Sequence, residues 1–166
     1  MKQFKTFLLA IALCIGTLSF SEAQVKIAHI NTQELINAMP EMKTARAELE
    51  ALSKTYQTDL QNMGTEFQNK VKQYDAEAAT KTQEENTKRA QEVQTMEQNI
   101  RQFQGQAQQD LQKKEGELMK PITDKALAAI NKVSKAQGYQ YVLDRASLIV
   151  AEGKDLMADV KKELGI

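Results

Sequence analysis

The sequence predicts a mainly α-helical protein with a small β body, in which a long antiparallel helical hairpin, or coiled-coil arm, projects from that body. Three observations support this prediction. Residues 41–137 contain a single proline and almost no turn residues, apolar residues recur along them at spacings of three and four, and short β-branched segments flank them on both sides. Spacings of three and four are typical of a helix that buries one narrow face.

The helical stretch contains two apolar stripes, in residues 42–78 and 90–118, that match each other in reverse order. Paired members have residue numbers that add to 159 or 160, as Tyr56 and Phe103 do. A constant total means that one antiparallel register satisfies all the pairs and that the chain reverses near residue 80. We therefore expect a helical-hairpin arm over residues 41–118, with its tip near that position.

Capping signals mark the ends of the predicted helices. Thr82 stands three residues before Glu85, which is the pattern expected where the returning helix begins. Asn31, followed by Glu34, predicts the start of a short helix ahead of the arm. Gly138 predicts that the returning helix ends in a left-handed cap.

The segments that flank the arm contain short runs of β-branched and aromatic residues, which predict strands. We expect Arg145-Ala146-Ser147 to form a tight connection between the last two strands, and Asp155 to cap a final helix. The three expected strands are residues 25–30, 139–144 and 148–151.

Residues 24–40 and 119–166 are expected to form a β-rich oligomerisation body. A sheet of this size buries little surface, and the arm adds only a narrow seam, so self-association is the expected remedy for a small core. The residues that we place in the shared core are Ile27, Ile30, Tyr141, Leu143 and Val150.

Residues 1–23 predict a signal peptide. Two lysines precede an apolar run at residues 7–18, and Ser21-Glu22-Ala23 places small residues where signal peptidase recognises them, so we expect cleavage after Ala23. An uncleaved membrane anchor is the alternative, but the run is shorter than the ~20 residues that a span needs. Cys14 lies in this run after a leucine, so we interpret it as part of the discarded segment and not as a lipidation site.

Without residues 1–23 the chain has 143 residues, of which 20 are basic and 21 acidic, and it has no cysteine. This charge balance does not favour a nucleic-acid partner, because binding to nucleic acid calls for a marked excess of basic residues. The sequence has no phosphate-binding loop, no nucleophile with a neighbouring base and no metal-ligand spacing, so we expect neither an enzyme nor a cofactor. The single histidine, His29, is expected to be structural.

The strand at residues 26–31, the long hairpin, the segment 138–144 and the helix after Gly153-Lys154-Asp155-Leu156 follow one another in an order that resembles the Skp (OmpH-like) family of periplasmic chaperones. The resemblance covers the whole chain after residue 23. It implies a jellyfish-like homotrimer, in which three arms enclose a cavity, and an ATP-independent periplasmic holdase that keeps unfolded outer-membrane proteins soluble. The best-known members are strongly basic and this chain is near neutral, which argues against lipopolysaccharide or membrane binding.

Most of the apolar stripe is expected to pack inside the hairpin, but toward the tip the pairing fails, because Val71 and Tyr74 meet no large apolar partner. We expect partly exposed client contacts there, for which methionine is also well suited. The candidates are Met63, Val71, Tyr74 and Met96. The alternative function is a structural or adaptor coiled-coil protein of the cell envelope, which would have a defined partner and no effect on unfolded clients.

Overall fold

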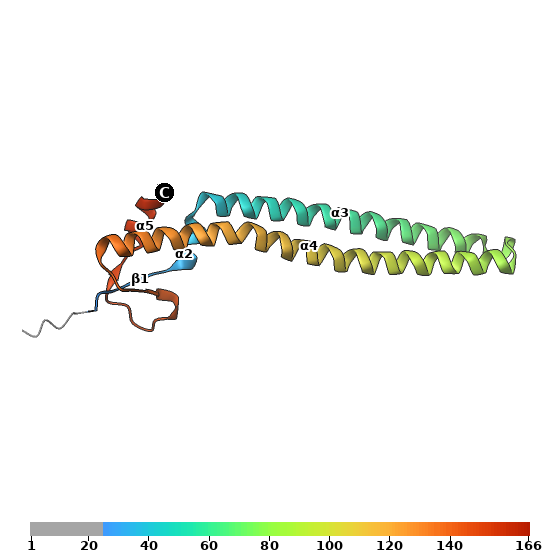
Figure 1. The fold of residues 1–166 in the computed structure, drawn as a ribbon. Helices are drawn as coiled ribbons and strands as arrows, with labels where there is room; N and C mark the ends of the chain where they lie inside the picture. The colour runs from blue at the N-terminus through green and yellow to red at the C-terminus, as the bar shows by residue number, and fades with distance from the viewer. Residues whose placement is uncertain (1–24) are drawn as a thin grey trace, which may run out of the picture.

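The computed structural model describes residues 25–166. Two long helices lie side by side and project from a small body at one end (Figure 1). They are α3 (Pro40–Glu77) and α4 (Gln83–Gln137), joined at the far end by the short 3-10 helix η1 (Ala78–Thr80). The 38 residues of α3 make it about 57 Å long. The predicted signal peptide, with Cys14 and the cleavage site after Ala23, lies outside the described residues.

Three of the predicted helix caps are confirmed. The Thr82 hydroxyl accepts a hydrogen bond from the Glu85 backbone N–H at 3.2 Å, where α4 begins. The Asn31 side chain accepts from the Glu34 N–H at 3.0 Å, and this cap starts the short helix α2 (Thr32–Ala38). Gly138 ends α4 with φ of 73°, a left-handed conformation that glycine adopts without steric cost.

The sheet has three short strands, β1 (Ile27–Ile30), β2 (Tyr141–Asp144) and β3 (Lys154–Asp155), in the order β2-β1-β3. Both pairings are parallel. Parallel neighbours cannot be joined by a tight turn and need a crossover connection. The hairpin arm is that connection between β1 and β2, so the sheet anchors both ends of the arm.

The predicted strand at residues 148–151 is wrong. After β2 the chain forms the 3-10 helix η2 (Arg145–Ser147), and the third strand is Lys154–Asp155, which pairs with the far edge of β1. A tight connection would have made an antiparallel hairpin with β2, whereas the chain instead crosses to the other side of the sheet. The last helix is α5 (Met157–Leu164), and its N-cap is Leu156 and not the predicted Asp155. The Asp155 side chain, one residue earlier, accepts a hydrogen bond from the Met157 N–H at 2.8 Å.

The core lies in the body, where α2, the base of α4 and α5 cover one face of the sheet. Leu35, Leu156 and Val160 are 0% exposed, and Ile30 and Met39 are also fully buried. The α4 residues that complete this core are Ile122, Ala126, Ala129, Ile130 and Val133. In the described part of the chain, no helix is both long enough and apolar enough to cross a membrane.

Candidate functional site

The seam between α3 and α4 is the most extended feature of the molecule. At its middle, the rings of Tyr56 and Phe103 meet edge to face with their centroids 5.9 Å apart. The Tyr56 hydroxyl also donates to Asp110 across the seam at 3.1 Å. The predicted antiparallel register is therefore confirmed at the Tyr56–Phe103 pair.

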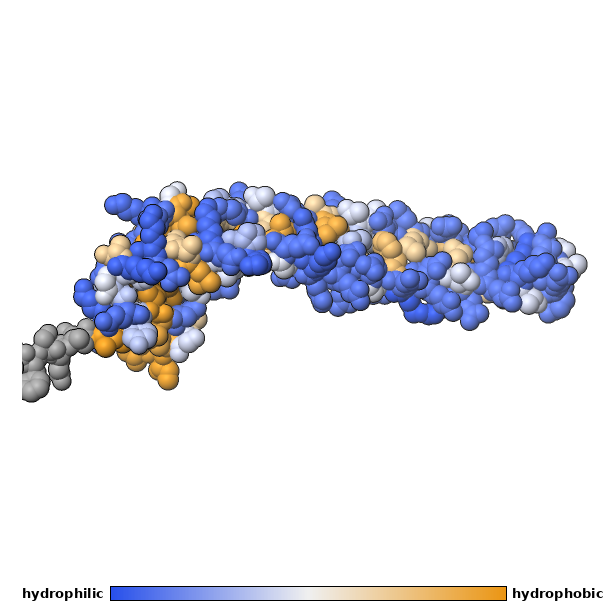
Figure 2. Space-filling view, viewed as in Figure 1, coloured by the Kyte–Doolittle hydropathy of each residue, from blue (hydrophilic) through white to orange (hydrophobic). Residues whose placement is uncertain are grey.

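This seam is only half closed. In α3 the one buried side chain is Ala45, and in the arm portion of α4 it is Ala107. The larger apolar residues of both stripes are half-buried, because two helices alone can cover only one side of each residue. An apolar strip consequently remains accessible along the arm, and Figure 2 shows it as orange and tan patches between blue surfaces.

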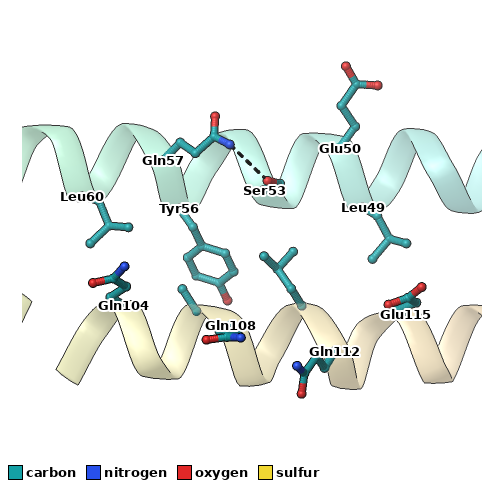
Figure 3. Close-up of a pocket in the computed structure, with 12 residues that line it drawn as sticks. Leu49, Glu50, Ser53, Tyr56, Gln57, Leu60, Gln104, Gln108, Gln112 and Glu115 are labelled. Carbon is teal, nitrogen blue, oxygen red and sulfur yellow. Dashed lines mark hydrogen bonds between the residues drawn. The ribbon is translucent and has the colours of Figure 1, made fainter. Parts of the chain in front are cut away.

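A groove of about 610 Å³ lies along the seam near the middle of the arm. Figure 3 shows Leu49, Tyr56 and Leu60 extending from α3 toward α4. Ala107 and Leu111 of α4 also line the groove and complete its apolar floor. Polar side chains flank this floor on both helices. They are Glu50, Ser53 and Gln57 on α3, and Gln104, Gln108, Gln112 and Glu115 on α4.

Two of the predicted client contacts, Met63 and Met96, are brought together across the seam. They line a smaller opening of about 190 Å³ with Ile100. Both methionine side chains are half-buried. The structure thus places a flexible apolar pair from two helices at one accessible point of the arm.

The other two predicted contacts, Val71 and Tyr74, line an opening of about 360 Å³ near the tip, together with Arg89 and Ala90. Both are half-buried. The register places Arg89 and Ala90 opposite Val71, and Val93 lines the same opening. Tyr74, in contrast, has polar and charged partners.

Two cations lie near the Tyr74 ring, with the Lys70 Nζ 5.4 Å and the Arg89 Cζ 4.6 Å from its centroid. Its hydroxyl donates to Glu92, which also pairs with Lys70 at 3.1 Å. The contacts of Tyr74 and Lys70 with Arg89 and Glu92 join α3 to α4 near the tip. The Tyr74 hydroxyl, followed by Lys70, lowers the pKa of the Glu92 carboxyl because both stabilise its charged form. We call Lys70, Tyr74, Arg89 and Glu92 the tip clasp.

The body exposes a second apolar surface. Ile27 pairs with Tyr141 in the sheet, and these two side chains and Leu143 are exposed on the face away from the helices. Val150 is exposed in the segment after η2, and its neighbour Ile149 is 102% exposed. In Figure 2 this surface appears as orange at the lower part of the body.

Ile30 is the fifth residue predicted for a shared core, and unlike Ile27, Tyr141, Leu143 and Val150 it is not exposed. It is 1% exposed and packs in the core of its own chain. The alternation along β1 explains this difference, because successive side chains point to opposite faces of a strand. Ile30 follows His29, which lies on the outer face.

His29 has a structural position. It is buried, and its Nε2 lies 3.0 Å from the carbonyl oxygen of Gly153, so it holds the segment before β3 against the sheet. Gly153 is close enough that a Cβ there would lie 3.8 Å from the imidazole ring. Among residues 25–166, no group of three or more metal-binding side chains is assembled.

Comparison with known proteins gives a consistent family assignment. The family model for outer membrane protein (OmpH-like) matches residues 26–164. Among solved structures, the chain is similar to a candidate outer membrane chaperone (OmpH-like) from Caulobacter crescentus CB15, with a TM-score of 0.76 and 18% identity over 84% of this chain and 85% of that one. No curated protein matches the sequence. The family match extends from β1 to the end of α5, and on that evidence the chain belongs to the OmpH-like outer membrane protein family.

Proposed function

We propose that this protein is a chaperone of the periplasm that holds unfolded outer-membrane proteins soluble without ATP. Membership of the OmpH-like family and the likeness to a candidate outer membrane chaperone support the chaperone role. The observation that carries the proposal is the half-closed seam, whose accessible apolar strip extends along the arm between polar flanks. Such a strip offers many weak contacts to an unfolded chain.

The working unit in this proposal is a homotrimer, with residues 24–40 and 119–166 as its body and residues 41–118 as its arm. The uncovered apolar face of the sheet supports self-association, since Ile27, Tyr141 and Leu143 are exposed in a single chain. The outer edge of β2 also has no strand beside it in the described residues. The proposal of three subunits follows from the family resemblance.

The charged surface of the arm supports holding and not catalysis. Its carboxylates pair with cations one helical turn away, as Glu84 does with Lys88 at 2.8 Å and Glu97 with Arg101 at 2.5 Å. Such i,i+4 pairs belong to a solvated helix surface. The balance of charge argues against binding to lipopolysaccharide or to an anionic membrane surface.

The test is suppression of aggregation. An outer-membrane β-barrel protein unfolded in urea is diluted into buffer with and without residues 24–166 of this protein, and light scattering is recorded. We expect scattering to fall as the chaperone approaches one trimer per client, with no change on adding ATP. Undiminished scattering, together with capture of one defined folded envelope partner, would instead support the structural or adaptor role.

A further inference from the structure

The groove in the middle of the arm has a regular polar wall. Gln104, Gln108 and Gln112 lie in a row along α4, one turn apart, beside the apolar floor (Figure 3). All three side chains are exposed. Among the residues drawn there, the one hydrogen bond joins Gln57 to Ser53 at 3.4 Å, so the three α4 carboxamides are bonded to none of their neighbours in the groove.

The spacing of this row matches that of an extended peptide. Eight residues of helix rise about 12 Å, and a row of i,i+4 positions is inclined by about 26° to the axis, so the row is about 13 Å long. An extended chain advances about 3.3 Å per residue, so four steps also cover about 13 Å. Alternate residues of an extended segment would therefore meet successive glutamines.

The hydrogen-bonding groups also match. In a strand, every second residue presents both its N–H and its C=O to the same edge. A glutamine carboxamide has both a donor and an acceptor, so it can pair with both groups. These contacts are neutral and involve only the backbone, so they accept any client sequence.

The apolar floor also requires a particular order of apolar and polar side chains in the bound segment. When one edge of an extended segment faces the α4 glutamines, its side chains point alternately toward the floor and toward solvent. Leu49, Tyr56 and Leu60 would then contact every second side chain. A segment with alternating apolar and polar residues satisfies both the floor and the solvent side.

We propose that this groove binds an extended segment of an unfolded protein in which apolar and polar side chains alternate, with Gln104, Gln108 and Gln112 pairing one edge of its backbone. The proposal rests on the proposed function, and it specifies what the arm recognises. The groove recognises the strand-like alternation of apolar and polar side chains and not a particular sequence. An unfolded β-barrel chain supplies this alternation repeatedly.

The probe is an end-capped nine-residue peptide of alternating leucine and serine that carries a fluorophore. A second peptide has the same side chains but methyl groups on the backbone nitrogens of alternate residues, which remove the donors of one edge. A third has the same composition with leucines and serines in separate blocks. Binding to the assembled protein (residues 24–166) is measured by fluorescence anisotropy. We expect the first peptide to bind about tenfold more tightly than either of the others.

The groove variant carries Gln104→Met, Gln108→Met and Gln112→Met, which keep side-chain length and helix propensity but remove the carboxamides. The matched control carries Gln94→Met, Gln98→Met and Gln102→Met, a row with the same spacing on α4 that lies outside the groove. The groove variant should lose the discrimination against the methylated peptide. The control variant should discriminate as the unchanged protein does.

Equal discrimination by both variants, or no preference for the alternating peptide in the unchanged protein, would overturn the proposal. So would an absence of any peptide binding. These outcomes are separable from failure of the proposed function, because suppression of aggregation is measured independently on the unchanged protein. If the protein protects the client but does not discriminate between the peptides, only the groove proposal is rejected. If it does not protect the client, the holdase function is rejected.

Discussion

The body and the arm bury their apolar residues to very different degrees. In the body, Leu35 and Leu156 are completely buried between helices and sheet. In the arm, Leu60 and its neighbours along the seam are half-buried, and Ala45 and Ala107 are the buried side chains. Stabilisation by the hydrophobic effect is roughly proportional to the apolar area removed from water. The body therefore concentrates the stability of the chain, while the arm keeps apolar surface available to a partner.

The body also leaves apolar surface uncovered, but that surface is organised differently from the arm. Tyr141 and Leu143 project from one face of a regular strand that ends the sheet. A flat, ordered face suits another copy of the chain, whereas an extended seam with polar flanks suits variable partners. The following experiments test this division of roles.

The largest effect is expected from Leu143→Asp. In the proposed trimer this side chain lies between subunits, where an unpaired carboxylate is strongly unfavourable. Sedimentation equilibrium should show a trimer for the unchanged protein and a monomer for the variant at micromolar concentration. Leu127→Asp is the control, because Leu127 is similarly exposed but lies on α4 and not on the sheet. If only the control variant dissociates, the subunit interface lies on α4 and not on the sheet.

A smaller effect is expected from truncating single leucines. Leu35→Ala should lower the free energy of unfolding by about 2–5 kcal/mol, because it leaves a cavity in a closed core. Leu60→Ala should lower it by about 1 kcal/mol, because this side chain is already partly exposed and leaves no closed cavity. Urea unfolding at a fixed protein concentration measures both. Equal losses would show that the arm is packed as tightly as the body.

The smallest effect is expected at the tip clasp. Tyr74→Phe removes the hydroxyl that donates to Glu92 but keeps the ring beside Lys70 and Arg89. Amide hydrogen exchange should become faster in residues 70–93 and remain unchanged around Tyr56. Tyr56→Phe, which removes the bond to Asp110 beside the Phe103 ring, is the matched control at the middle of the arm.

The same clasp should respond to acid. The pKa of Glu92 is lowered in the folded protein, so its contribution to stability is fully present above its unfolded pKa, near 4.5, and is lost as the pH falls through the lower folded value. Exchange at residues 70–93, corrected for its intrinsic pH dependence, should therefore accelerate below pH 4.5. In a Glu92→Gln variant this acceleration should be reduced; an unchanged acceleration would assign it to another group.

Much of the fold could be predicted because its signals are local. The caps at Asn31, Thr82 and Gly138 depend on residues within one turn, and the arm register depends on a repeated apolar spacing. The third strand could not be found in this way. Lys154–Asp155 has no strand-like composition, and it becomes a strand because β1 offers it a free edge, whereas the strongly β-prone residues 148–151 find no strand partner within residues 25–166.

The candidate site was predictable in part for similar reasons. The apolar pattern indicated Val71 and Tyr74 as incompletely paired residues, and the adaptability of methionine added Met63 and Met96; all four side chains are half-buried. The tip clasp was missed because Lys70, Arg89 and Glu92 are charged and so belong to no apolar pattern, and because Arg89 and Glu92 lie on the opposite helix. The glutamine row was visible in the sequence as a repeat of four, but its position beside the apolar floor required the register of both helices.

The most direct test of the account shortens the arm while keeping the body. Residues 67–93 are replaced by a short Gly-Ser turn, which removes the tip clasp and retains the groove that contains Leu49, Tyr56 and Leu60. Assembly is measured by sedimentation, and protection of a large unfolded β-barrel client by light scattering. If arms hold clients by enclosing them, the shortened protein should remain a trimer and still bind the alternating peptide, but fail to protect the large client. Full protection by the assembled, shortened protein would contradict enclosure and assign client binding to the body.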